Sequence, residues 1–486
     1  MVLAAGEGTR MASRSTAKVL HGFAGRSLLG HVLAAAGPLL ADTTVVVVGH
    51  RREDVAAHVA DICPSATCAV QQVQLGTGHA VAVALQAVPP QLVGSRPGTV
   101  LVMPGDAPLL STATLDLLLH EHRTSGAAAT MLTSVLADPD GYGRVIRAGN
   151  GSVERVVEHK DATPSEREVH EVSALVYAFD HALLADALGR LTTANSQGEQ
   201  YLPDVVSILV GDGHPVGAVQ APADETAGVN DRVQLAQAHR LYNLRLLEAH
   251  MRAGVTVVDP ASTWVDADVL LAADVSLLPS VELHGATSIG EGAEIGPQVT
   301  LTDTHVGPGA RISRAVAVGA QVGAGTTVGP FAYLRPGTVL ADAAHVGTFV
   351  EVKNSDIGTG TKVPHLSYVG DATIGEHTNI GAATVFVNYD GVAKHRSTIG
   401  DHARTGADNM FVAPVHVGDG AYTAAGSVIT NDIPAGAMGV ARASQRNVEG
   451  WVLRKRSGTA AAQAAQAAGA AAESDAAKAV AEDTAE

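Results

Sequence analysis

Two different patterns of hydrophobic residues divide the chain. In roughly the first 225 residues, short runs of β-branched and aliphatic residues alternate with longer stretches that favour helix. Three of these runs predict strands: Thr43–Val48, Thr99–Met103 and Ala128–Val135. Strands that alternate with helices are typical of an α/β domain built around a mostly parallel sheet.

A six-residue rhythm replaces this pattern in the second half of the chain. An aliphatic residue, often followed by Gly, recurs at a spacing near six over about ten steps. One short strand and one turn per repeat predict a parallel β-helix whose aliphatic side chains form an internal ladder. The many Gly residues supply the positive φ angles that tight corners require. The predicted ladder contains Ile289, Ile295, Val322, Val328, Leu334, Leu340, Val346, Val352, Ile357, Val363, Val369, Ile374 and Ile380.

The two patterns are joined by a segment of helix-forming residues, 229–253, which contains neither Pro nor Gly and has apolar residues at helical spacing. It predicts a single connecting helix. Residues 456–486 are rich in Ala and have no apolar stripe large enough to anchor them, so they predict a disordered tail. The expected units are therefore residues 1–228, the linker helix 229–253, a β-helix over 254–455 and the tail 456–486.

Composition excludes several classes of function. The formal net charge of −17 argues against a general nucleic-acid binder, because phosphate backbones are held by clustered Lys and Arg. No run of apolar residues is long enough to span a membrane, and no secretory leader is visible, so we expect a cytoplasmic protein. Cys63 and Cys68 are the two cysteines, which argues against a disulfide framework or a zinc site.

The start of the chain carries a candidate phosphate-binding turn. Residues 3–11 read LAAGEGTRM, and Lys18 follows in the segment AKVLH. A short strand followed by a turn of small residues can bring backbone N–H groups, Arg10 and Lys18 against a triphosphate. A G-x-G turn by itself also fits an ordinary connection between strand and helix, and the spacing to Lys18 makes the pattern more specific.

Further motifs follow in a fixed order: QQVQLGTGHA at 71–80, PGDAPL at 104–109, GYGR at 141–144, VEHKD at 157–161, QGE at 197–199 and GVN at 228–230. Together with the first turn they resemble the sugar-phosphate nucleotidyltransferases. Residues 1–455 as a whole are similar to the bifunctional family of N-acetylglucosamine-1-phosphate uridyltransferases and glucosamine-1-phosphate acetyltransferases. This resemblance implies a Rossmann-like α/β nucleotidyltransferase domain followed by a left-handed parallel β-helix of hexapeptide repeats.

In the first half, the resemblance implies a site for a uridine nucleotide and a sugar phosphate. Asp106 and Asn230 would hold Mg²⁺, because hard oxygen ligands suit that ion. Arg10 and Lys18 would stabilise charge on the phosphates, and Gly143 and Glu158 would contact N-acetylglucosamine. The residues expected to bind UTP or UDP-N-acetylglucosamine are Leu3, Ala4, Ala5, Gly6, Arg10, Lys18, Gln71, Gly76, Thr77, Gly105, Asp106, Gly143, Glu158, Ser173 and Asn230.

In the β-helix, polar motifs interrupt the ladder, among them LRPG at 334–337, VEVKNS at 350–355 and PHLSYVGD at 364–371. Acetyl transfer to an amine needs a base, because only the neutral amine attacks, and His titrates near neutral pH. The resemblance makes His365 that base. It also implies a homotrimer that acts on small molecules. Arg335, Lys353, Tyr368 and Asn379 would bind glucosamine-1-phosphate, and Ala382, Asn388, Tyr389, Ala407, Ala425 and Arg442 would bind acetyl-CoA.

The chain departs from the family pattern at several positions. Only Met1 and Val2 precede LAAG where the family has several apolar residues, so we expect the natural start to lie upstream. Ser173 and Leu175 stand where the family generally has Asn and Gly, which predicts weaker binding of N-acetylglucosamine-1-phosphate. Ala383 replaces a common Gly.

Two alternative functions stay open at this stage. One is an acetyltransferase whose nucleotide-binding half is impaired, which the changes at Ser173 and Leu175 favour. The other is a trimeric scaffold or a carbonic-anhydrase-like β-helix that uses some of its 21 His residues for zinc. That reading requires three His side chains to converge across subunits, whereas His365 belongs to an acyl-transfer motif.

Overall fold

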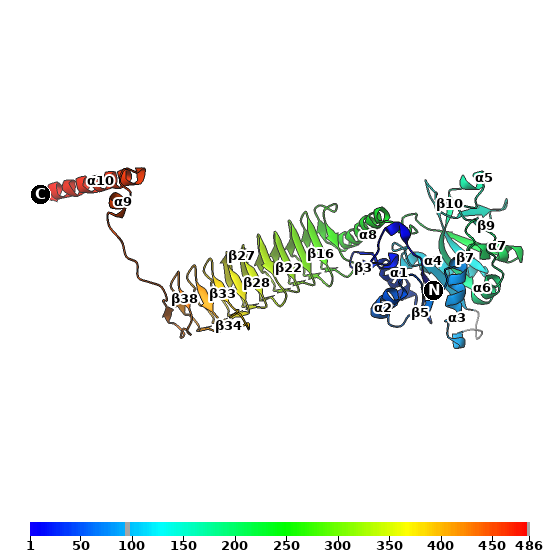
Figure 1. The fold of residues 1–486 in the computed structure, drawn as a ribbon, viewed down its shortest axis with the longest axis horizontal. Helices are drawn as coiled ribbons and strands as arrows, with labels where there is room; N and C mark the ends of the chain where they lie inside the picture. The colour runs from blue at the N-terminus through cyan, green and yellow to red at the C-terminus, as the bar shows by residue number, and fades with distance from the viewer. Residues whose placement is uncertain (93–97, 484–486) are drawn as a thin grey trace.

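The computed structural model describes residues 1–92 and 98–483. The molecule is elongated, with the α/β domain at one end and a rod of stacked coils extending from it (Figure 1). A separate helical segment lies beyond the far end of the rod. The two halves predicted from the hydrophobic patterns are therefore two distinct architectures.

The α/β domain is built on one sheet with the strand order β11-β7-β10-β6-β1-β4-β5, and β8 and β9 extend it beside β10. Three predicted strands are confirmed as β4, β6 and β7. The sheet is mostly parallel, as predicted, and β10 is the strand of this order that runs antiparallel to its neighbours β6 and β7. The strands are β1 (Val2–Ala4), β4 (Val45–Val48), β5 (Thr67–Val70), β6 (Thr99–Pro104), β7 (Ala129–Val135), β8 (Arg144–Arg147), β9 (Val153–Val157), β10 (Glu171–Asp180) and β11 (Val216–Gln220), with a separate hairpin of β2 (Gly22–Phe23) and β3 (Arg26–Ser27).

Helices pack around this sheet, and several begin at side-chain caps. Ser111 caps α4 through Thr114 N, and Asp180 caps α6 through the backbone N–H groups of Ala182 and Leu183. Such caps satisfy donors at the helix start that otherwise lack partners. The helices are α1 (Leu28–Ala36), α2 (Arg52–Ile62), α3 (Thr77–Gln86), α4 (Thr112–Ser125), α5 (Pro164–Arg167), α6 (His181–Leu188) and α7 (Asp204–Gly211).

The rod is a parallel β-helix with three faces, each a sheet of parallel strands. Its handedness stays a prediction. The first sheet contains β12 (Thr256–Val257), β15 (Ser276–Leu277), β18 (Glu294–Ile295), β21 (Arg311–Ile312), β24 (Thr327–Val328), β27 (His345–Thr348) and β30 (Lys362–His365). The second contains β13 (Trp264–Val265), β16 (Val281–His284), β19 (Val299–Thr302), β22 (Ala315–Val318), β25 (Ala332–Leu334), β28 (Glu351–Lys353), β31 (Tyr368–Gly370), β33 (Val385–Val387), β35 (Met410–Val412) and β38 (Val428–Ile429). The third contains β14 (Leu270–Leu271), β17 (Ser288–Ile289), β20 (His305–Val306), β23 (Gln321–Val322), β26 (Val339–Leu340), β29 (Asp356–Ile357), β32 (Ala372–Ile374), β34 (Ser397–Ile399) and β36 (His416–Val417), and β37 (Tyr422–Thr423) pairs with β39 (Met438–Gly439) at the end of the rod.

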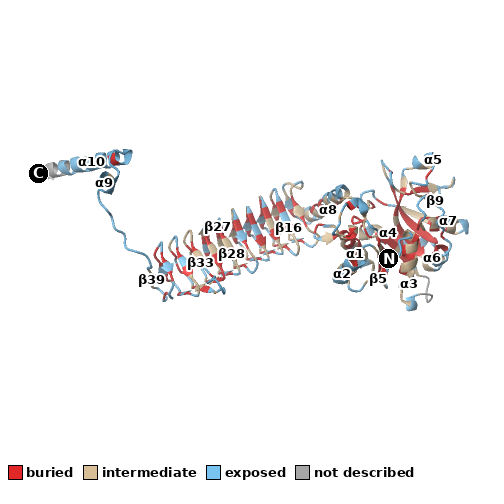
Figure 2. Cartoon of the chain, in the orientation of Figure 1, coloured by how far each residue is buried: buried red, intermediate tan, exposed pale blue. Residues whose placement is uncertain are grey.

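The predicted aliphatic ladder is confirmed, because each of its thirteen members is buried and belongs to one continuous core. The buried residues form a band along the axis of the rod (Figure 2). Paired ladder residues on neighbouring coils, such as Leu277 and Ile295, lie 18 positions apart, or three repeats. One coil is longer, since Ile374 pairs with Ile399, 25 positions on. The longer coil contains the segment that carries Asn388, Tyr389 and Lys394.

The predicted connecting helix is confirmed as α8 (Arg232–Arg252), which the Asp231 side chain caps through Gln234 N. Its Asn243 is buried and fastens the helix to the first coil. The side-chain amide donates to Thr263 O at 2.8 Å and accepts from Val265 N at 3.0 Å. The helix thus joins the two domains through hydrogen bonds to backbone as well as through packing.

The predicted disorder of the Ala-rich tail is not what the structure shows. Within it, Ala460–Asp483 form the long helix α10, and the short helix α9 (Trp451–Lys455) precedes it, in place of the β-helix predicted to continue to residue 455. Ala has the highest intrinsic helix propensity, which can support a helix that buries little apolar surface. The guanidinium of Arg456 lies 5.0 Å from the ring centroid of Trp451.

Tight stacking of the coils predicts that Gly375 cannot carry a side chain. An added Cβ atom would lie 2.2 Å from Asp401 Oδ1 and 2.7 Å from Asp401 N. We expect Gly375→Ala to lower the free energy of unfolding by about 1–3 kcal/mol, the usual effect of overpacking. Thermal denaturation measures this, with Gly149→Ala as the control, because a Cβ there meets nothing within 4 Å. Equal melting temperatures for the two variants would contradict the stacking.

Candidate active sites

The predicted phosphate-binding turn follows β1 in the middle of the sheet, where β4 and β6 pair with that strand on either side. The carbonyl oxygen of Ala5 accepts hydrogen bonds from Gln74 Nε2 at 2.6 Å and His50 N at 3.2 Å. A Cβ on Gly49 would lie 2.8 Å from the same oxygen, so Gly permits this close approach. At Gly6, by contrast, an added Cβ would meet nothing within 4 Å.

Lys18 lies at the centre of a polar cluster that joins three distant motifs. Its ammonium group forms an ion pair with Asp106 and lies 3.2 Å from Asn230 Oδ1. Arg10 donates to the same Asn230 oxygen at 2.9 Å. The segment that carries Asn230 is held here because Val229 N donates to Asp106 O at 2.8 Å. The structure therefore brings together the four charged or metal-binding residues predicted for the nucleotide site.

The donor set of this cluster fits a divalent cation. Asp106 and Asn230 direct their side-chain oxygens at one shared cation, the Lys18 ammonium, and both are hard ligands of the kind Mg²⁺ prefers. Mg²⁺ commonly takes one or two protein ligands and completes its shell with water and substrate phosphates. Among the described residues, no group of three or more His, Cys, Asp or Glu side chains is arranged to hold a metal, so no zinc site is visible within this part of the chain.

The predicted base-binding residues lie on the neighbouring side of the turn. Gln71 is buried and donates to Gly76 O at 3.1 Å. Thr77 begins α3, and its hydroxyl accepts from Leu202 N at 2.9 Å. Gly76 has a φ of 106°, and a Cβ there would lie 2.6 Å from Gln200 O.

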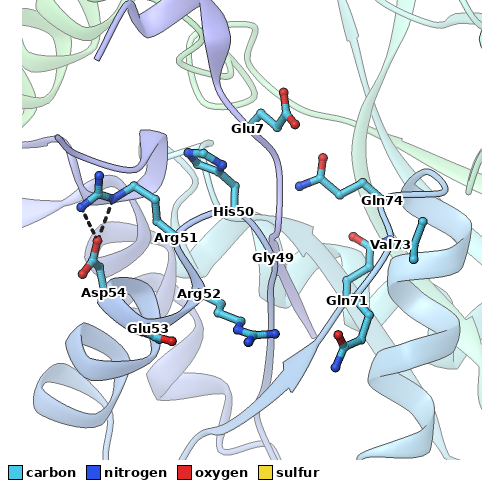
Figure 3. Close-up of a pocket in the computed structure, with 11 residues that line it drawn as sticks. Glu7, Gly49, His50, Arg51, Arg52, Glu53, Asp54, Gln71, Val73 and Gln74 are labelled. Carbon is cyan, nitrogen blue, oxygen red and sulfur yellow. Dashed lines mark hydrogen bonds and ion pairs between the residues drawn. The ribbon is translucent and has the colours of Figure 1, made fainter. Parts of the chain in front are cut away.

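A cavity of about 750 Å³ opens beside these residues. Figure 3 shows His50, Arg51 and Arg52 on one side of it and Gln71 and Gln74 on the other. Sequence reasoning identified Gln71 but missed the three basic residues. They lie just beyond Gly49, which follows β4, and a run of three basic residues after a buried strand was the signal that could have found them.

The predicted sugar-binding residues Gly143, Glu158 and Ser173 lie close to one another. Ser173 N donates to Gly143 O at 2.9 Å, and a Cβ on Gly143 would lie 3.5 Å from Glu158 Oε1. Tyr177 is fully buried, and its hydroxyl lies 2.8 Å from Ser173 Oγ. Burial raises the pKa of Glu158, and the negative charges of Asp204, Asp161 and Glu199 raise it further.

Leu175, two residues after Ser173, occupies a strained position. The register of β10 against β7 shifts between Ser173 and Tyr177, and Leu175 within the shift has a φ of 57°. A left-handed conformation costs a residue with a side chain about 1–2 kcal/mol, whereas Gly adopts it freely. The Ser173 hydroxyl also accepts from Leu175 N at 3.3 Å. The segment 173–175, which differs from the family pattern, thus forms a strained bulge. The Ser173 hydroxyl within it already has hydrogen-bond partners.

In the β-helix, the residues predicted to bind the sugar phosphate lie on successive coils. Arg335, Lys353 and Tyr368 come from or directly follow the adjacent strands β25, β28 and β31. The Arg335 guanidinium donates to Glu351 at 2.8 Å, and the Lys353 ammonium lies 3.1 Å from Asp371 Oδ2. The register of the sheet therefore aligns cations that lie 18 positions apart in the sequence.

His365 ends strand β30 and lies beside Thr348 in the sheet register. Its side chain is exposed, and within the described residues its imidazole has no hydrogen-bond partner. Asn379 lies on the next coil, in register with Lys362. The candidate base therefore stands on the surface of the rod, where a substrate can reach it.

The residues predicted for acetyl-CoA fall into two groups. Ala382, Ala407 and Ala425 follow one corner of the rod, because Asp408 N donates to Ala382 O at 2.7 Å and Gly426 N to Ala407 O at 2.9 Å. A Cβ on Gly426 would lie 3.7 Å from Arg442, which continues the line. Asn388 and Tyr389 lie on the longer coil, with Asn388 Nδ2 3.4 Å from the Tyr368 hydroxyl.

Comparison with known proteins gives two findings. A model of the MobA-like NTP transferase domain family matches residues 1–227. The chain is 60% identical to the bifunctional protein GlmU of Streptomyces avermitilis over 96% of each chain, and 57% identical to that of Thermobifida fusca over 98% of each. The chain belongs to the bifunctional GlmU family. A further member, from Nocardia farcinica, is 54% identical over 96% of this chain and 94% of its own.

Family membership explains why the two architectures occur in one chain: each half of a bifunctional protein carries its own site. The Lys18 cluster and His365 lie in different domains, which α8 joins. In the part of the chain that the structure describes, no helix is both long and apolar enough to cross a bilayer.

The raised pKa of Glu158 predicts a pH-dependent effect on stability. A carboxyl whose pKa is higher in the folded state than its usual 4.5 destabilises the fold when it is ionised, and this penalty disappears as pH falls below 4.5. We expect Glu158→Gln to melt at a higher temperature than the parent at pH 7.5, with the difference shrinking toward pH 5. Glu154→Gln, on strand β9 four positions before Glu158 and paired with Arg155, is the control and should gain no stability. A difference that grows on acidification would contradict this reasoning.

Proposed function

We propose that this chain catalyses the two transfers that make UDP-N-acetylglucosamine. The β-helix moves an acetyl group from acetyl-CoA to glucosamine-1-phosphate. The α/β domain then joins N-acetylglucosamine-1-phosphate to a uridylyl group from UTP and releases pyrophosphate. The observation that carries the proposal is the convergence of distant motif residues in both domains, Lys18 with Asp106 and Asn230, and Lys353 with Asn388 around Asp371.

In the nucleotidyl transfer, an oxygen of the sugar phosphate attacks the α-phosphorus of UTP and pyrophosphate leaves. The reaction gathers negative charge on phosphate oxygens, so positioned cations supply most of the catalysis. Arg10 and Lys18 provide these cations next to the turn, and backbone N–H groups near Gly6 can approach the phosphates. Asp106 and Asn230 would hold Mg²⁺, which neutralises phosphate charge when it is bound.

In the acetyl transfer, His365 takes a proton from the ammonium group of glucosamine-1-phosphate, because only the neutral amine attacks the thioester carbonyl. Arg335 and Lys353 bind the sugar phosphate, and Tyr368 and Asn379 orient the sugar. The corner line through Ala382, Ala407, Ala425 and Arg442, together with Asn388 and Tyr389 of the longer coil, forms the acetyl-CoA groove. Small residues along that line leave room for an extended cofactor.

The assembly we propose is a homotrimer, a prediction that rests on the resemblance. It is supported by the exposure of His365 together with a stripe of exposed apolar side chains at the same corner: Phe331, Phe349 and Leu366 are each more than half exposed. A neighbouring subunit that covered this corner would complete the acetyl-transfer site and exclude water from it. The cytoplasmic location likewise stays a prediction.

A second candidate function is acetyl transfer with a weakened nucleotidyl half. The strained Leu175 and the short Ser173 favour it, because both lie where the sugar is expected to bind. The cluster at Lys18 is intact, however, which favours two working sites.

The independence of the two sites predicts the behaviour of His365→Ala. Loss of a general base reduces rates by roughly 10²–10⁴-fold, so CoA release from acetyl-CoA and glucosamine-1-phosphate should fall by that amount. Pyrophosphate release from UTP and pre-acetylated sugar phosphate with Mg²⁺ should be unchanged, because His365 and the Lys18 cluster lie in different domains. Parallel assays of CoA and pyrophosphate measure both. If His365→Ala reduced both rates equally, the two sites would not be independent. A parent protein that released neither CoA nor pyrophosphate would refute the proposed function.

The bulge at 173–175 predicts a repairable defect. The double variant Ser173→Asn with Leu175→Gly should relieve the backbone strain and add an amide that can reach the sugar. One added hydrogen bond is worth about 0.5–1.5 kcal/mol, which corresponds to a KM for N-acetylglucosamine-1-phosphate roughly 2–13-fold lower. Steady-state pyrophosphate release at saturating UTP measures this, and the KM of the acetylation reaction serves as the internal control. An unchanged or higher KM would show that these positions do not limit sugar binding.

A further inference from the structure

The carboxylate of Asp371 connects residues of both proposed acetyl-transfer substrate sites. It follows strand β31 at a corner of the rod, and it is 6% exposed. Its carboxylate accepts hydrogen bonds from Lys353 Nζ at 3.1 and 3.3 Å, from Asn354 Nδ2 at 2.6 Å, and from Asn388 Nδ2. Lys353 belongs to the proposed sugar-phosphate site and Asn388 to the acetyl-CoA groove. One buried carboxylate therefore contacts both substrate sites.

The backbone around Asp371 is held on several sides. Asp371 N donates to Lys353 O at 3.0 Å, and Ser397 N donates to Asp371 O at 3.1 Å. Its φ of 50° is left-handed, a conformation that Asp tolerates better than most residues. The carboxylate is therefore fixed by the coils before and after it.

Gly370 makes the convergence possible. A Cβ at this position would lie 2.4 Å from the Tyr368 hydroxyl and 2.8 Å from Asn388 Nδ2. Because Gly has no side chain, the Tyr368 ring and the Asn388 amide can both reach the space beside Asp371. The sequence Tyr368-Val369-Gly370-Asp371 thus forms a single polar junction with Asn388.

Positive side chains outnumber carboxylates around Asp371. Burial tends to raise the pKa of Asp371, yet hydrogen bonds from Asn354, Lys353 and Asn388 hold it below its usual value. Lys353 in turn lowers the pKa of Lys394 through hydrogen bonding and repulsion. The region thus holds more cations than carboxylates, which suits a phosphate ligand, and the one buried carboxylate determines where the Lys353 ammonium lies.

We propose that Asp371 is a positioning residue for acetyl transfer, which holds Lys353 toward the sugar phosphate and Asn388 toward the thioester at the same time. This proposal rests on the proposed acetyltransferase function of the β-helix. The binding of both substrates would then depend on Asp371, although neither substrate touches it.

The test uses the full chain with Asp371→Asn, which keeps the size of the side chain and removes its charge. A misplacement of about 1 Å can reduce catalysis by roughly 100-fold. We expect kcat/KM of acetyl transfer to fall by about that factor, with a higher KM for glucosamine-1-phosphate and also for acetyl-CoA. Uridylyl transfer by the same molecules should be unchanged and shows that the chain is folded. Asp401→Asn, an exposed turn residue of the same rod, should leave both activities unchanged.

A second comparison separates positioning from folding. In a Lys353→Met background, Asp371→Asn should cause little additional increase in the KM for glucosamine-1-phosphate, because its partner is already gone, but it should still raise the KM for acetyl-CoA through Asn388. If Asp371→Asn raised the KM for glucosamine-1-phosphate as much in the Lys353→Met background as in the parent, the proposal would be overturned. So would unchanged kinetics in Asp371→Asn. If the parent chain acetylates and Asp371→Asn does so equally well, the positioning role fails and the proposed function stands.

Discussion

The structure depends on the stacking of the β-helix coils, which an internal ladder of aliphatic side chains keeps in register. Each ladder residue is buried against its counterparts on the coils above and below, and a shift of one residue would turn polar side chains into the core. The same register decides which exposed residues become neighbours. Arg335, Lys353 and Tyr368 are far apart in the sequence, but they lie on or directly after three adjacent strands of one sheet. The hydrophobic core thus sets the geometry of the acetyl-transfer site.

A different constraint organises the nucleotide half. There β1 lies between β4 and β6, so the turn that follows it, the segment after β4 and the PGD turn after β6 emerge at one edge of the sheet. Loops at the carboxyl ends of parallel strands are where such sheets bind ligands. The Gly228–Asn230 segment then returns the chain to Asp106 before α8 begins. One domain gathers its site from loops at a sheet edge, and the other from a rigid surface of stacked strands.

Regular features of the fold could be predicted from the sequence because short-range periodicity encodes them. The aliphatic ladder, the strands β4, β6 and β7, and the connecting helix were all predicted and are confirmed. The antiparallel β10 was not, because strand direction depends on chain return and not on local pattern. The helical tail was missed because Ala-rich, weakly amphipathic segments fit both helix and disorder. The motif residues of the site came from resemblance, whereas partners such as Asp371 for Lys353 and the basic residues beside Gln71 required coordinates, since nothing in the local sequence reports a contact across coils.

The register of the coils places the sugar phosphate, the base and the cofactor groove on one stretch of the rod. A crystal structure of the full chain with glucosamine-1-phosphate and CoA bound tests it most directly. We expect the phosphate to bind against Arg335 and Lys353, with the amino group toward His365 and the CoA along the corner of Ala407 and Ala425. A sugar phosphate bound on another face of the rod, with His365 open to solvent, would contradict it.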